Sequence, residues 1–117
     1  MPAIPFRVAF ADMDSALAQE LELALSSLNV EVVSTGNTEV QLIFCDSSQV
    51  VKPVRHFPGI PVVAVSPVRE VRHLLDAMDS GAVDYCFSPF ENSDLNWILK
   101  SHCRPAANAR PSVQKAA

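Results

Sequence analysis

Short apolar segments alternate along this chain with segments that repeat apolar residues at helical spacing. Each apolar segment is followed directly by Asp or Ser, and the five segments are 6–11, 30–33, 40–45, 61–65 and 84–87. Strands that are apolar on both faces are typical of a parallel sheet that is covered by helices on both sides. The alternation therefore predicts an open, doubly wound α/β sheet of five mainly parallel strands.

Helices are expected between these strands wherever the chain leaves room for them. Leucine and alanine recur at helical spacing over 17–28, residues 68–78 carry apolar residues on one face, and 95–99 repeats the pattern. The residues placed to cap or end these helices are Asp14 or Ser15, Ser66 followed by Pro67, Gly81 and Ser93.

The middle of the chain is short for such a sheet. Only residues 34–39, with the turn-like stretch at 36–39, separate the second and third strands, whereas a parallel crossover normally takes about a dozen residues and a helix. We expect that helix to be absent. The direction of the second strand stays open: it is parallel, or a tight turn at STGN makes it antiparallel or displaces it. Between Asp46 and Pro61 there is room for one reduced helix, which Pro53 is expected to break.

Length and charge bound the class of protein. A chain of 117 residues supports one core, which we assign to residues 1–103, whereas 104–117 has no periodicity and is expected to be a flexible tail or linker. The net charge is -4 and the 9 Lys and Arg residues are scattered, which argues against direct nucleic-acid binding. No apolar run approaches the roughly eighteen residues of a membrane span.

The cysteines point to a reducing compartment. Cys45, Cys86 and Cys103 lie far apart and form no CxxC pair, so we expect buried hydrophobic residues and not a metal or redox site. The first residues also lack the basic and apolar segments of a secretory signal. A cytoplasmic location is the expectation.

Polar side chains stand where four of the predicted strands end. They are Asp12, Asp46, Ser66 and Ser88. Because the carboxyl ends of parallel strands meet at one edge of a sheet, we expect these side chains to gather there. That edge is the candidate functional site.

Residues 7–100 resemble the receiver domains of two-component response regulators. The most specific part is GAVDYCFSPF, residues 81–90, which is similar to the family's loop, fifth strand and following turn. The resemblance implies a flavodoxin-like fold, here with the second helix missing and the third reduced. It also implies a role in signal transduction and not an enzyme of metabolism.

The resemblance assigns roles to residues at the strand ends. In VQLIFCD, Asp46 falls on the family's phospho-accepting aspartate, and in VAFADMD, Asp12 falls on the first of its paired acids. Ser66 and Tyr85 fall on the hydroxyl and aromatic positions of the family's switch pair. Mg²⁺ prefers carboxylate oxygens and offsets the charge of a phosphoryl group. Asp12, Asp46 and, as a replacement ligand, Asp14 are the candidates for holding it.

Two positions depart from the family. Met13 stands at the second paired acid, and its thioether is a poor ligand for a hard cation. Ser88 stands where the family has a lysine. We expect weakened metal binding and weakened stabilisation of a phosphoryl group. Two hypotheses stay open: an atypical receiver phosphorylated at Asp46, and a phosphorylation-independent interaction and dimerisation module.

The resemblance also implies partners. A sensor histidine kinase would supply the phosphoryl group, and a homodimer would form through residues 68–78, the fifth strand and the last helix. The tail would join the domain to an output domain, by family analogy a transcriptional one.

A hypothesis from another class is a phosphatase of the haloacid dehalogenase type. FADMDSAL resembles that family's DxD signature, with Asp12 as nucleophile and Asp14 as general acid and base. However, Ser15 and Ala16 stand where that family has glycine and threonine, and the chain is short for its core and cap. The receiver hypothesis is therefore preferred.

Overall fold

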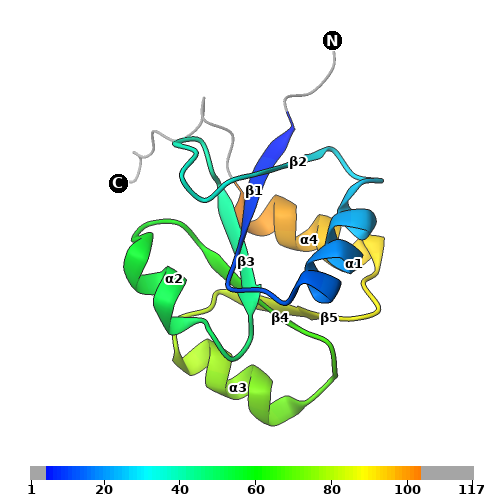
Figure 1. Cartoon of the computed structure of the whole chain (residues 1–117). Coiled ribbons are helices and arrows are strands. Elements are labelled where there is room, and N and C mark those ends of the chain that lie inside the picture. Colours follow the sequence, from blue (N-terminus) through cyan, green and yellow to red (C-terminus); the bar gives the residue numbers. More distant parts are fainter. Residues whose placement is uncertain (1–4, 104–117) are drawn as a thin grey trace, which may run out of the picture.

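The computed structural model describes residues 5–103, in which strands and helices alternate (Figure 1). The strands are β1 (Phe6–Ala11), β2 (Val30–Val33), β3 (Leu42–Asp46), β4 (Val62–Ser66) and β5 (Asp84–Phe87). The helices are α1 (Ser15–Leu25), α2 (Val51–His56), α3 (Val71–Asp79) and α4 (Asn92–His102). Within the described range, no helix is long and apolar enough to cross a membrane. The predicted tail, residues 104–117, lies outside the described residues.

The strands form one sheet in the order β2, β1, β3, β4, β5, and every neighbouring pair is parallel. This confirms the predicted doubly wound α/β sheet, and the order is the flavodoxin-like one. β2 pairs with β1 from Val30 opposite Phe6 to Val33 opposite Ala9. The second strand is therefore parallel, and the antiparallel alternative is wrong.

Helices cover both faces of the sheet (Figure 1). α1 and α4 lie on one face, where their buried residues pack with Val8, Phe44 and Val65 of the strands. Those buried residues are Leu17, Leu21, Leu25, Leu95, Ile98 and Leu99. α2 and α3 lie on the other face and are less deeply seated, because Pro53 and Ala77 are their only buried residues.

A loop replaces the helix that is missing between β2 and β3. Within residues 34–41 the chain forms turns, and Val40 is buried in the core beneath them. Arg7 on β1 forms ion pairs with Glu31 at 3.3 Å and with Glu39 of the loop at 2.9 Å. The loop thus covers the sheet at the point where the absent helix would lie, as the short spacing predicts.

α2 is the reduced helix that the sequence predicts, but Pro53 does not break it. The helix spans Val51–His56, and Pro53 lies buried in its first turn. The first four N–H groups of a helix have no partner inside the helix, so a proline there costs no hydrogen bond. The prediction of a break at Pro53 is wrong.

Two predicted helix starts are also wrong. Ser66 does not cap α3, because it is the last residue of β4 and its hydroxyl donates to the carbonyl of Val68 at 2.7 Å. α3 begins beyond this turn. Ser93 lies inside the first turn of α4, which begins at Asn92. The side-chain oxygen of Asn92 accepts a hydrogen bond from the Ser27 hydroxyl at 3.2 Å, which ties this helix start to the end of α1.

Candidate functional site

The carboxyl ends of the strands bring the predicted site residues to one edge of the sheet. Asp46 and Ser66 are the last residues of β3 and β4, and Asp12 and Ser88 directly follow β1 and β5. The backbone N–H of Ser88 donates to the carbonyl of Ser66 at 3.0 Å, which joins these two strand ends. The predicted gathering at one edge is found, whereas the chemical roles of these residues stay predictions.

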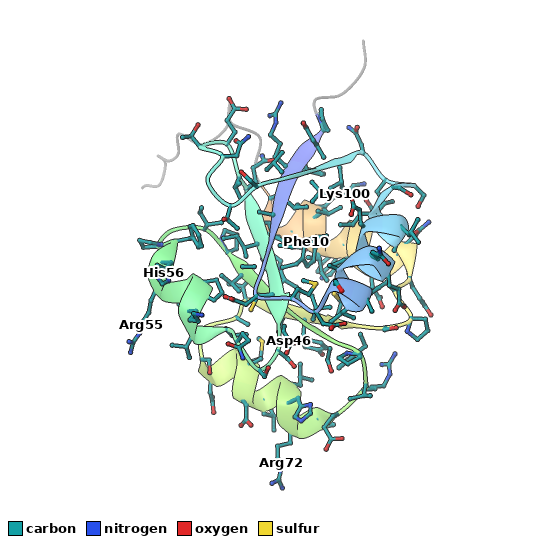
Figure 2. The ribbon with its side chains drawn as sticks, in the orientation of Figure 1. Phe10, Asp46, Arg55, His56, Arg72 and Lys100 are labelled. Carbon is teal, nitrogen blue, oxygen red and sulfur yellow. The ribbon has the colours of Figure 1, made fainter. Side chains whose placement is uncertain are left out.

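Asp46 lies at the lower end of β3, above α3 (Figure 2). Its Oδ1 accepts hydrogen bonds from the backbone N–H of Ser48 at 2.9 Å and from the Ser48 hydroxyl at 2.7 Å. Within residues 5–103, Oδ2 takes part in no hydrogen bond. One oxygen of this carboxylate is therefore fixed, and the other is available to an incoming group.

Asp12 lies beside a cation that the sequence analysis did not identify. Its φ is 50°, a left-handed conformation that Asp adopts more readily than most residues. Its Oδ1 lies 3.7 Å from Nζ of Lys52 in α2. Both side chains are more than one-third exposed, 37% and 63%, so the pair contributes little to stability. Lys52 has no motif of its own, and its position six residues after Asp46, in the segment predicted to form the reduced helix, was the available signal.

Asp12 and Asp46 follow neighbouring strand positions, because Ala11 of β1 pairs with Cys45 of β3. Burial raises the pKa of Cys45 to about 12, and the negative charges of Asp12 and Asp46 contribute to the increase. All three cysteines are free and buried, as predicted.

Asp14 and Met13 have structural partners elsewhere. Oδ2 of Asp14 accepts the backbone N–H of Ala16 at 3.1 Å and of Leu17 at 3.3 Å, which confirms the predicted N-cap of α1. Met13 packs against the apolar cluster under α1 and α4. A role as a metal ligand or as a general acid would compete with this cap for the same carboxylate group. This disfavours both the replacement-ligand hypothesis and the phosphatase hypothesis.

Ser88 is bonded to an acid of α1. Its hydroxyl donates a hydrogen bond to Oε2 of Glu20. Where the family resemblance implies a lysine, this chain therefore has a hydroxyl linked to a carboxylate. The peptide bond from Ser88 to Pro89 is cis.

Ser66 and Tyr85, the predicted switch pair, lie on the same face of the sheet but are not opposite each other in the pairing of β4 with β5. Ser66 pairs with Phe87, whereas Tyr85 pairs with Ala64. The ring of Tyr85 lies 5.4 Å from that of Phe87, and the guanidinium of Arg69 lies 4.9 Å from the Phe87 ring centroid. Phe87 thus connects the loop after Ser66 to Tyr85. The sequence analysis assigned Phe87 only to a strand, because a strand aromatic is ordinarily a core residue.

The residues at this edge are a poor donor set for Mg²⁺. Within residues 5–103, no group of three or more His, Cys, Asp or Glu side chains could hold a metal ion. Mg²⁺ requires oxygen ligands in near-octahedral geometry. Asp12 and Asp46 supply carboxylates, but Met13 is packed into the core and Asp14 caps a helix.

A cavity of about 500 Å³ opens between Asp46, the end of β4 and α3. We call it the α3 cavity. It is lined by Asp46, Ser47, Ser48, Val50, Val51, Ser66, Pro67, Val68, His73, Asp76 and Ser80. Two of the predicted site residues, Asp46 and Ser66, therefore border a space large enough for a small molecule.

The chain matches no protein-family model and no curated protein, but it resembles several solved structures. A response regulator from Thermotoga maritima has a TM-score of 0.63 and 19% identity, covering 83% of this chain and 96% of its own. The orphan response regulator HP1043 of H. pylori has a TM-score of 0.62 and 20% identity, covering 88% and 100%. A protein assigned to pilus assembly (CpaE) from Burkholderia thailandensis has a TM-score of 0.65 and 23% identity, covering 83% and 97%.

This chain has the receiver fold. The expectation from the sequence resemblance is thereby confirmed at the level of the fold, although identity is low. The receiver fold accounts for the meeting of Asp12, Asp46 and Ser66 at one edge. One fold can serve many functions, and the similar proteins include both response regulators and one assigned to pilus assembly. The fold alone therefore does not identify the function of this chain, which depends on its own site and surface residues.

Proposed function

We propose that this chain is a regulatory receiver domain of signal transduction that acts by association with a second copy of itself, without requiring phosphorylation of Asp46. It is not proposed to be an enzyme. The surface of association is formed by α3, β5 and α4, which we call the α3 face. The observation that carries the proposal is the exposure of the apolar side chains of α3.

The apolar stripe of α3 points away from its own domain. Val71 is 67% exposed and Leu75 is 59% exposed, whereas Ala77 is the only buried residue of this helix. Trp97 of α4, which lies with Arg69 and Tyr85 around a shallow pocket at the β5 edge of the sheet, is 68% exposed. Contiguous exposed apolar side chains of this size are typical of interaction surfaces.

The charges on α3 favour a second copy as the partner. Arg72 and Asp79 both lie on this helix and are exposed. In a two-fold arrangement the same patch contacts itself, so a basic residue of one copy can lie opposite an acidic residue of the other. The exposed apolar residues of α3 then form the contact, and the charged residues beside them fix the orientation of one copy relative to the other.

The site residues support independence from phosphorylation. A phosphoryl group on Asp46 would add negative charge near Asp12, while Ser88 brings Glu20 and not a lysine to the edge. Met13 provides no carboxylate for a metal ion that could offset this charge. The free energy of the chain phosphorylated at Asp46 is therefore high relative to that of the unmodified chain.

Sedimentation velocity tests the proposed association. We expect the wild-type chain to sediment as a concentration-dependent dimer and Leu75→Glu to sediment as a monomer, because a charge would be buried in the contact. Leu23→Glu is the matched control, since Leu23 is 74% exposed on α1, a helix that is not part of the α3 face. A monomeric wild type, or equal effects of the two variants, would contradict the proposal.

A second candidate is a receiver that is phosphorylated at Asp46, for which a sensor histidine kinase would be the partner. It is favoured by the free Oδ2 of Asp46 and by Lys52, which brings a cation beside Asp12. In this reaction the phosphoryl group passes from a small donor such as acetyl phosphate to a carboxylate oxygen, and acetate leaves.

Intact-mass spectrometry separates the two candidates. The chain is incubated with Mg²⁺ and acetyl phosphate, beside Asp46→Asn. A single phosphate adduct that the variant loses would establish the second candidate. Absence of the adduct, together with dimerisation, would support the first. The transcriptional output that the family resemblance implies and the cytoplasmic location that the cysteines favour belong to either candidate.

A further inference from the structure

The α3 cavity has the size and lining of a small-molecule site, of which the candidate functions use only Asp46. At about 500 Å³ it lies within the usual range for ligand pockets, roughly 300–1,000 Å³. The sheet edge supplies Asp46 and buried Ser66, and α3 supplies His73 and Asp76 on the other side. The cavity is thus bordered on one side by the sheet edge and on the other by α3, and it is not a groove on a single helix.

The charge of the cavity is negative. Asp46 and Asp76 both line it, His73 is the other titratable residue of the lining, and no Lys or Arg lines it. Among the cations of α2 and α3, Lys52 is paired with Asp12, and Arg55 and Arg72 point outward (Figure 2). Carboxylates that border a partly enclosed space focus a negative potential into it. An anion is therefore disfavoured there and a cation is favoured.

The rest of the lining is suited to an organic body and not to a bare ion. Val50, Val51 and Val68 supply apolar walls, and the hydroxyls of Ser47 and Ser80 border the same space. The described side chains lack a cluster that could coordinate a metal ion. A ligand with one ammonium group on a compact apolar body matches both parts of the lining, because the carboxylates meet the charge and the valines meet the body.

We propose that the α3 cavity binds a small organic ammonium compound, with Asp46 and Asp76 as the countercharges. Binding does not depend on the proposed function. Its effect on association does rest on that function, because α3 is both a wall of the cavity and the centre of the α3 face. A ligand that contacts Asp76 from inside then changes the position or mobility of the helix that contacts the second copy.

Amide NMR titration with three matched probes tests the site. The probes are phenethylammonium, phenethyl alcohol and phenylpropionate, which share an aromatic body and differ in charge. We expect phenethylammonium to shift the amides of the cavity lining with millimolar affinity, the alcohol to bind more weakly and the anion to bind least. Asp76→Asn should weaken phenethylammonium binding about fivefold. Asp79→Asn is the matched control, since Asp79 lies on the same helix outside the lining.

Each outcome decides the proposal. Equal shifts from the anion, equal effects of the two Asp variants, or absence of shifts at the cavity would overturn it. Sedimentation with and without phenethylammonium is then the separate readout for regulation. Binding at the cavity with unchanged sedimentation would support the site and contradict its coupling to association. A dimer that forms without any binding would leave the proposed function intact and overturn the site.

Discussion

The hydroxyl of Ser88, just after β5, donates a hydrogen bond to the carboxylate of Glu20 on α1. This contact joins the edge of the sheet to a helix on the opposite side from α3. It also sets the charge at that edge, because an acid is held where the family resemblance implies a base.

A double-mutant cycle tests this contact. Ser88→Ala, Glu20→Ala and the double variant are compared by urea unfolding. Because Glu20 is exposed and Ser88 is half-buried, we expect a coupling of about 0.5 kcal/mol, at the low end for a hydrogen bond. Strictly additive effects of the two substitutions would mean that the bond is not formed in solution.

Restoring the missing acid should restore metal binding. In Met13→Asp a carboxylate can join Asp12 and Asp46, so we expect Mg²⁺ affinity measured by calorimetry to rise by about tenfold or more. The variant should also lose stability, because Met13 packs against the core. Met78→Asp, on exposed α3, is the control and should leave Mg²⁺ affinity unchanged. An unchanged titration of Met13→Asp would reject the inferred geometry of the edge.

Gly81 ends α3 with a φ of 114°, as its predicted role as a left-handed cap requires. A Cβ at this position would lie 3.1 Å from Cγ1 of Val54. We expect Gly81→Ala to lower the free energy of unfolding by about 1–3 kcal/mol, measured by urea denaturation. Gly36→Ala is the matched control, because its Cβ would lie 3.9 Å from the nearest atom, at an ordinary φ. Equal losses in the two variants would show that neither backbone angle nor crowding matters at Gly81.

The buried thiols should make the fold sensitive to alkali. Burial raises the pKa of Cys45 and of Cys103 from 9.0 to about 12, and that of Cys86 further. The unfolded thiols therefore ionise first, so the stabilisation is complete below pH 9 and is lost as the pH rises from 9 toward 12. Each thiol lowers the free energy of unfolding by up to about 1.4 kcal/mol per pH unit in that range.

Urea unfolding at several alkaline pH values measures this slope. Replacing one thiol, as in Cys45→Ala, should reduce the slope of the unfolding free energy against pH by up to about 1.4 kcal/mol per pH unit. If the variant and the wild type lose stability at the same rate, Cys45 is not protected in the folded state.

Much of the architecture could be predicted from the sequence, because it depends on local patterns. The apolar segments gave β1, β2 and β5 with the bounds that the structure has, and the short spacing between β2 and β3 excluded a helix. Asp12 and Asp46 could be assigned to one edge, since parallel strands that are joined by right-handed crossovers present their carboxyl ends on the same side.

The helix starts at α3 and α4 could not be predicted in this way. A Ser followed by Pro is a good cap in isolation, but Ser66 stays in β4 because the ladder with Phe87 extends to it and its hydroxyl is used by Val68. Glu70 and Glu91 precede the two helices without side-chain caps. Here tertiary pairing overrides a local preference that is worth only about 1 kcal/mol.

The sequence by itself therefore determined the parallel sheet, the missing helix and the acids at the strand ends, because hydrophobic period and spacing are properties of neighbouring residues. Only the tertiary structure decided the direction of β2, the pairing of Lys52 with Asp12, the contact of Ser88 with Glu20 and the cavity beside α3. Each of these joins residues from elements that are distant along the chain. Their meeting depends on how helices seat against the sheet, which no local pattern encodes.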